Sequence, residues 1–352
     1  MRPVRRPVRH VALLLGALCF AGDRGPAQAA GNFASDPAAD PEDDPVELRY
    51  KLGEHPEKGD AYLEFRQDVE QYLENERGGR SARTKVSQVV GMMRKVEGTA
   101  DETRLELRFD RVALSYQNAS GRQGFDSDKG GAPPGPAASV YRPILGRGFE
   151  MHLDPEHRML RTRGLVEIEA DLSRSADLHV VDQLGFLFRE DYHKLLWADM
   201  QRVLYKGDLI RVGDTWSRRI DPELEPERVM NFSYKIESID RVRGRVRLSY
   251  RATLLRPEGA KAKRSADGSL VSFGKGKLAG TAVYDIARGE FVLQEEESDL
   301  FLDLFIRAAG NGNRVKLINK IKRRYKVVSP EERKARKTRL GSAKTQRIVQ
   351  RH

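Results

Sequence analysis

Histidines and clustered carboxylates stand at a few places where they could support metal binding or catalysis. His152 and His157 flank an Asp-Pro turn, with Asp154 and Glu156 between them. Two imidazoles and two carboxylates around one turn could hold a surface metal ion. A third ligand at a diagnostic spacing is missing, and no His-Glu-x-x-His helix occurs. We therefore expect an ordinary polar turn and no metal.

The other clusters are equally incomplete as catalytic sites. Asp191 and His193 are accompanied by no Gly-x-Ser-x-Gly elbow, so we expect His193 to face solvent from an amphipathic helix. Residues 126–128 (Asp-Ser-Asp) lack the rest of a calcium loop and suit a strand-end turn. The glutamates at 295–297 are consecutive, so on a strand they point to alternate faces. The sequence predicts no enzyme and no cofactor.

The first 29 residues have the pattern of an export signal. Four arginines precede a short apolar stretch, residues 11–20, and Ala27-Gln28-Ala29 forms a small-x-small cleavage site. We expect cleavage near Ala29 and a mature protein in the periplasm or cell envelope. The Arg5-Arg6 pair leaves twin-arginine export as the alternative to general secretion. Cys19, the only cysteine, lies within the signal, so the mature chain has no disulfide and no thiol nucleophile.

Positive charge is concentrated at the C-terminus. The whole chain carries +11, residues 314–352 alone carry +13 (15 Lys and Arg against two Glu), and residues 30–313 carry about −6. We expect residues 329–352 to form a disordered basic tail that is either inert or docks to a polyanion, such as anionic lipid or an anionic envelope polymer. Nucleic acid is disfavoured because exported proteins rarely meet it. The candidate docking residues are Lys322, Arg323, Arg324, Lys326, Arg333, Lys334, Arg336, Lys337 and Arg339.

Alternating apolar and polar residues predict two β modules, at 46–171 and 209–328, after an acidic flexible linker at 30–45. In the first module the alternation changes phase after Asp110, which predicts a twist or a bulge there. Between the modules, apolar residues at three- and four-residue spacing predict a helical segment over 172–208. We expect a mainly β protein of two antiparallel meanders, a curved sheet or half-barrel, with the helical segment as a plug or as a lid over a cavity.

Each module begins near a Gly-Asp pair that is followed by an aromatic residue. Val212-Gly213-Asp214-Thr215-Trp216 precedes the second module's strands, and Lys58-Gly59-Asp60-Ala61-Tyr62 precedes those of the first. This echo favours an internal duplication, although any two meanders share some patterning. We expect Gly213 and Asp214 to shape a turn and Trp216 to anchor a core.

The chain also resembles a known group of proteins over about residues 46–308. The Val-Gly-Asp-Thr-Trp run, the strand end at 125–128 (Phe-Asp-Ser-Asp) and the late strand at 280–285 (Gly-Thr-Ala-Val-Tyr-Asp) carry the resemblance. The group consists of exported bacterial proteins catalogued only as a domain of unknown function. The resemblance implies a β-rich exported protein and brings no catalytic residues.

These observations favour a non-catalytic envelope protein that binds a small apolar or amphipathic ligand between sheet and helix. A cavity there would be lined by Tyr192, Trp197, Met200 and Trp216. The alternative is a structural or protein-interaction module with a filled core. A third hypothesis is a hydrolase with its site at loops 118–140 and 256–277.

Overall fold

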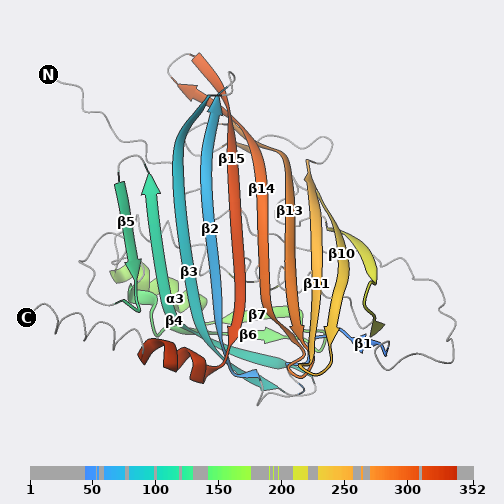
Figure 1. Ribbon diagram of the computed structural model, residues 1–352. Helices are drawn as coiled ribbons and strands as arrows, with labels where there is room; N and C mark the ends of the chain where they lie inside the picture. The colour runs from blue at the N-terminus through green and yellow to red at the C-terminus, as the bar shows by residue number, and fades with distance from the viewer. Residues whose placement is uncertain are drawn as a thin grey trace, which may run out of the picture.

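The computed structural model (Figure 1) describes most of the chain after residue 43. The described residues are 44–52, 54, 59–75, 79–98, 101–118, 121–129, 142–175, 190, 193, 197, 209–220, 229–256, 263–264, 270–308 and 311–338. The predicted signal, nearly all of the acidic linker, most of the segment 172–208, Tyr192, Met200 and Arg339 therefore lie outside them. Much of the two loops of the hydrolase hypothesis does so too. Within the described part, no helix is long and apolar enough to cross a membrane.

The protein is mainly β, as predicted, and its strands form an open, curved antiparallel sheet with few helices (Figure 1). In spatial order the main path is β7-β6-β4-β3-β2-β15-β14-β13-β11-β10-β9, with β5 beside β4 and β12 beside β13. The strands are β2 (Ala61–Asn75), β3 (Arg80–Gly98), β4 (Thr103–Asn118), β5 (Gly121–Asp126), β6 (Gly148–Leu153), β7 (Met159–Arg163), β9 (Thr215–Ile220), β10 (Val229–Asp240), β11 (Arg245–Leu255), β12 (Lys263–Arg264), β13 (Leu270–Asp285), β14 (Glu290–Ala308) and β15 (Asn311–Val328).

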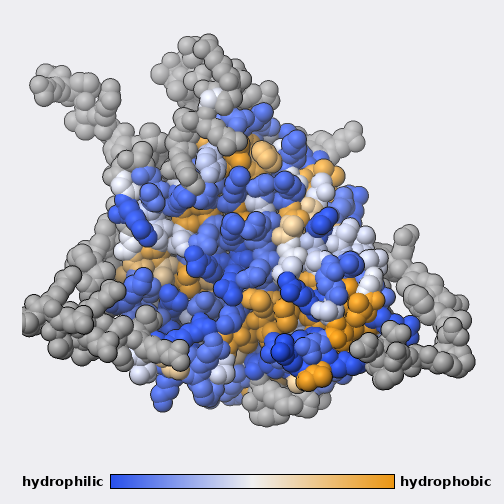
Figure 2. Space-filling view, in the orientation of Figure 1, coloured by the Kyte–Doolittle hydropathy of each residue, from blue (hydrophilic) through white to orange (hydrophobic). Residues whose placement is uncertain are grey.

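The two halves meet where the last strand, β15, pairs with the first long strand, β2. Their register runs from Val315 opposite Asn75 to Val328 opposite Tyr62. On the outer face, the basic residues of β15 lie between acidic residues of β2 and β14. Lys322, for example, lies opposite Asp68 on one side and Glu297 on the other, with Nζ 2.6 Å from the Glu297 carboxylate. Opposite charges across strands favour this register. Figure 2 shows the mainly hydrophilic surface over these central strands.

The sheet bends where the alternation of β4 changes phase, as predicted. Gly91 of β3 pairs with Arg111, while Met92 pairs with Phe109, so Asp110 is an extra residue in a β-bulge. The Tyr62 ring lies over Gly91, and a Cβ there would stand 1.9 Å from the Tyr62 hydroxyl. Only glycine fits beneath that ring. Beyond the bend, β4 pairs with β6, and β6 pairs with β7 (Figure 1).

Gly213 and Asp214 shape a turn at the start of the second module, where the Arg211 N–H donates to the Asp214 carboxylate at 2.7 Å. Gly213 has φ of +90°, and its N–H donates to the Ile236 carbonyl at 2.9 Å. In the first module, the Asp60 carboxylate accepts the Val96 N–H at 3.2 Å. Trp216 packs against the core and stacks on Tyr234, with ring centroids 5.0 Å apart. The duplication itself stays a prediction.

Residues 44–52 close one end of the sheet and contact both halves. Leu48, Tyr50 and Leu52 are buried. β1 (Val46–Glu47) pairs with β8 (Leu209–Ile210), and the Lys51 N–H donates to the Gly289 carbonyl at 3.0 Å. We assigned this segment to the first module, but it contacts the second as well. Such contacts between distant segments leave no trace in local periodicity.

A buried ion pair connects the two halves in the core. Arg94 of β3 donates two hydrogen bonds of 2.8 Å to the Glu290 carboxylate of β14, and a third of 2.8 Å to the Gly59 carbonyl. Both side chains are at most 1% exposed. Arg288 adds a bond from Nε to the same carboxylate. Burial opposes the charge on Arg94, yet the Glu290 carboxylate more than offsets this and raises the pKa of the guanidinium.

The segment after β15 is helical over residues 330–338, where we expected a disordered tail. Arg333 explains the difference, since its side chain is only 5% exposed. Its guanidinium donates two bonds to Asp128 (2.6 and 2.7 Å) and one to Asp110 (2.6 Å), and lies 4.7 Å from the Tyr62 ring centroid. These contacts hold the helix against the sheet. From composition alone, Arg333 was expected to be a solvated charge of the disordered tail.

Candidate functional site

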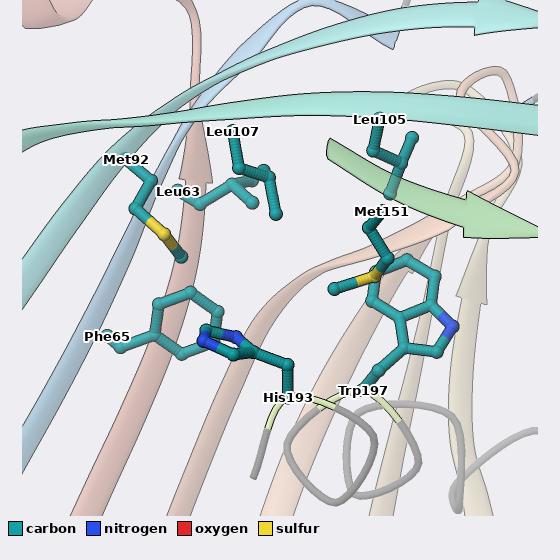
Figure 3. Close-up of a pocket in the computed structure, with 8 residues that line it drawn as sticks. All are labelled: Leu63, Phe65, Met92, Leu105, Leu107, Met151, His193 and Trp197. Atoms are coloured by element: carbon teal, nitrogen blue, oxygen red, sulfur yellow. The ribbon is translucent and has the colours of Figure 1, made fainter. Parts of the chain in front are cut away.

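A small apolar pocket lies on the core face of the first module (Figure 3). The sheet contributes Leu63 and Phe65 of β2, Met92 of β3, Leu105 and Leu107 of β4, and Met151 of β6. The register brings these side chains together, because Leu63 lies opposite Met92 and Leu105 lies opposite Met151. Alternation then points them all to one face. The sequence placed these residues on core-facing strands but did not identify them as a pocket.

His193 and Trp197 form the opposite wall of the pocket. Both positions are helical, and residues four apart share one helix face. Figure 3 shows both side chains pointing toward the sheet residues. Trp197 is buried, and its Nε1 donates to the His157 carbonyl at 2.8 Å. Tyr50 supports it, with ring centroids 5.9 Å apart.

The prediction that His193 faces solvent is wrong. It is 3% exposed, and its ring centroid lies 4.6 Å from that of Phe149. The apolar residues at three- and four-residue spacing, Tyr192, Leu195, Leu196 and Met200 among them, leave His193 on the polar side of the expected helix. The spacing to Trp197 was the signal that could have placed it on the buried side.

The pocket has little free volume. About 20 Å³ is open to the centre of a water molecule, which is room for one or two waters. Except for the imidazole of His193 and the indole N–H of Trp197, its walls are apolar. Such a lining suits an aliphatic group. The methionines at 92 and 151 are flexible and can adapt to different shapes.

The residues predicted to line a ligand cavity do not all meet there. Trp197 does. Trp216 does not, because β9 is at the opposite end of the strand order from β6 and β7. It lines no part of the pocket at His193 and packs on Tyr234 instead. Tyr192 and Met200 lie outside the described residues.

The polar residues of the turn at 152–158, near the pocket, bond to one another and to Glu102 and Glu150. His152 pairs with Glu102, and its Nε2 lies 3.3 Å from Glu150. Asp154 accepts the Arg158 N–H at 2.8 Å. Burial raises the pKa of Asp154, but its backbone and side-chain hydrogen bonds from Arg158 have the larger combined effect and lower the pKa. Burial lowers the pKa of His157. Among the described residues, no group of three or more His, Cys, Asp or Glu could hold a metal ion.

Most of the candidate docking residues that the structure describes lie in ion pairs within the chain. Three alternate along β15: Lys322 pairs with Glu297 (2.6 Å), Arg323 with Glu296 (3.5 Å) and Arg324 with Glu295 (3.1 Å). As predicted, these glutamates point to alternate faces, since Glu296 is buried while its neighbours are exposed. Lys326 and Arg336 pair with Glu332, and Lys337 pairs with Asp110 at 2.6 Å. Lys334 is exposed on the helical segment. Docking to a polyanion stays a prediction.

No family model and no curated protein sequence matches this chain. Among solved structures, lipovitellin gives a TM-score of 0.41 at 10% identity over 76% of this chain, which spans 25% of the lipovitellin chain. DynF from the dynemicin pathway of Micromonospora chersina gives 0.19 at 8% identity, covering 90% of this chain and 99% of its own. The β domain of the Bordetella autotransporter BrkA gives 0.20 at 9% identity, covering 74% and 98%. Likenesses this weak define no shared fold.

Proposed function

We propose that this protein is an exported, non-catalytic binding protein of the cell envelope that holds an apolar or amphipathic ligand on the core face of its curved sheet. The pocket at Met92, Met151 and Trp197 carries the proposal. Its walls combine aliphatic, thioether and aromatic groups from four strands with a covering tryptophan. An aliphatic chain end needs more room than the free volume provides, and rotamer changes of the two methionines are the readiest source of it.

The basic C-terminal residues supply the second part of the proposal, attachment to an anionic lipid or polymer surface. Lys334 and Lys337 are exposed on the same short helix whose Arg333 is buried against the sheet. Each Lys or Arg near an anionic membrane contributes roughly 1 kcal/mol. The helix contacts would hold the following residues close to the body while they bind.

The ligand half is tested with the mature protein and the uncharged dye N-phenyl-1-naphthylamine. The chain has two tryptophans, so in a Trp216→Phe variant only Trp197 at the pocket emits. We expect dye binding to quench Trp197 by energy transfer. Leu107→Trp, which fills the pocket, should abolish dye binding in the wild-type background, while Glu106→Trp on the exposed face of the same strand should not. Native mass spectrometry should find an extractable aliphatic ligand. A chain that carries no ligand and binds no dye would contradict the proposal.

The second candidate is a structural or protein-interaction module. The small free volume of the pocket favours it, because a filled core needs no ligand. Under this alternative, Leu107→Trp lowers the stability by overpacking, the dye does not bind, and affinity capture from envelope extracts yields a protein partner.

A further inference from the structure

Two buried amide side chains face each other in the middle of the sheet. Asn319 of β15 lies directly opposite Gln71 of β2. Asn319 is 0% exposed and Gln71 is 5% exposed. Neither Nδ2 nor Oδ1 of Asn319 has a hydrogen-bond partner, and Nε2 of Gln71 has none. Buried amides nearly always have partners, because an unpaired one costs free energy. Two in adjacent positions need a physical explanation.

Strand alternation places both amides on the core face. Asn319 lies between Leu317 and Ile321 along β15, and both neighbours belong to the core. Gln71 has the same phase on β2 as the core residue Val69. Thr84 of β3, also buried, lies opposite Gln71 and extends the row. A row of uncharged polar side chains is thus set among apolar ones.

The amides and the apolar pocket lie on one face of the same strand. Phe65, which lines the pocket, is six residues from Gln71 along β2, which corresponds to about 20 Å. The core-facing residues between them on β2 are Gln67 and Val69, and neither is charged. Arg323 on the neighbouring strand pairs with Glu296 of β14, on the side away from β2. Arg323 lies directly opposite Gln67, so the ion pair of Arg323 and Glu296 borders a path that is otherwise uncharged along β2.

We propose that Asn319 and Gln71 bind the uncharged polar head group of a long-chain amphipathic ligand, whose aliphatic chain runs along the core face of β2 to the pocket at Phe65. This inference rests on the proposed function and names its ligand class. Asn319 offers donors and an acceptor, and Gln71 offers a donor. The matching head group both donates and accepts, as a primary amide or a hydroxyl does. A carboxylate is disfavoured, because the two amides supply no cation to compensate its desolvation.

The experiment compares two ligands that differ only at the head. Hexadecanamide and hexadecane are each used to displace N-phenyl-1-naphthylamine from the mature protein. We expect the amide to displace the dye at about tenfold lower concentration, the effect of one or two hydrogen bonds. In an Asn319→Leu/Gln71→Leu double variant the two ligands should become equal. Because leucine removes unpaired amides, this variant should keep or raise its Tm.

The control is Lys320→Leu/Glu70→Leu, the adjacent positions on the same two strands with side chains on the outer face. It should keep the preference for the amide. Equal displacement by both ligands in the wild type would overturn the inference, and so would a preference that survives in the double variant. In both of these outcomes the dye still binds, so the proposed apolar site would stand while the head-group inference fails. Failure of the dye to bind the wild type at all would instead contradict the proposed function.

Discussion

Two buried arginines show how the same guanidinium chemistry serves two purposes in this molecule. Arg94 lies in the core and binds Glu290 and the Gly59 carbonyl, so it ties the first half of the sheet to the second. Arg333 lies on a short helix at the end of the described chain and binds Asp110 and Asp128 on the outer face. Both make paired bonds of 2.6 to 2.8 Å to one carboxylate.

The difference lies in what each arginine would leave behind if it were removed. Glu290 is only 1% exposed, so without Arg94 its carboxylate would stay buried with a single bond from Arg288 Nε to balance its charge. Asp110 is 17% exposed and also binds Lys337, so it would keep a partner and some water. A helix of this length is marginal in isolation, and it depends on its contacts with the sheet. The core pair therefore affects global folding, whereas the surface cluster affects one segment.

The largest effect is expected from breaking the core pair. Arg94→Met should lower the free energy of unfolding by about 3–5 kcal/mol, because it removes two of the bonds to the buried Glu290 carboxylate and leaves only Arg288 to balance the charge. Arg94→Met/Glu290→Leu should recover much of that loss, since well-packed apolar residues often replace a buried pair with little penalty. Urea denaturation followed by circular dichroism measures both. If the double variant is as unstable as Arg94→Met, the uncompensated charge of Glu290 is not the cause of the loss, and the prediction fails.

A smaller and local effect is expected at Arg333. Arg333→Met should cost about 1.5–3 kcal/mol of local stability through its bonds to Asp128 and Asp110. We expect hydrogen exchange of residues 330–338 to rise to that of an unfolded chain while exchange in β2 and β15 stays slow. The matched control is Lys334→Met, an exposed neighbour that should change stability by less than about 0.5 kcal/mol. Slow exchange at 330–338 in Arg333→Met would mean that other contacts hold the helix.

The comparison also separates what the sequence could predict from what it could not. The phase change after Asp110 gave the bulge, because a shift in alternation is local. Arg94 stands in the core-facing phase between Met92 and Val96, so a buried charge could have been suspected there. Its partner could not be named, since Glu290 is distant in sequence and meets it only through the β15–β2 junction. Arg333 carried no such signal, because its burial depends on Asp110, Asp128 and Tyr62 from other segments.

At the candidate site, too, the sequence predicts which residues face the core but not which of them meet. Alternation placed Leu63, Leu105 and Met151 on core-facing strands, but only the register shows that they converge on His193 and Trp197. Trp216 was grouped with Trp197 because both are aromatic and near the helical segment. The strand order separates them. Asn319 gave a sequence signal, a polar residue in the apolar phase of β15, although its partnerless state requires the packed structure.

The smallest predicted effect is a pH dependence that distinguishes the Arg333 cluster from the core of the sheet. Burial raises the pKa of Asp110, but its bonds to Lys337 and Arg333 outweigh this and lower it. A carboxyl whose folded pKa is lowered contributes stability that is present above its unfolded pKa of about 3.8 and is lost as pH falls through the folded value. We therefore expect hydrogen exchange at 330–338 to rise as pH falls below about 4, relative to the intrinsic rate, before β2 is affected. Asp110→Asn should weaken the helix contacts at neutral pH and make this pH step smaller, while the carboxylate of Glu332 still contributes to it. If β2 and residues 330–338 open together on acidification in the wild type, the helix is part of the global folding unit, and the division between the two arginines fails.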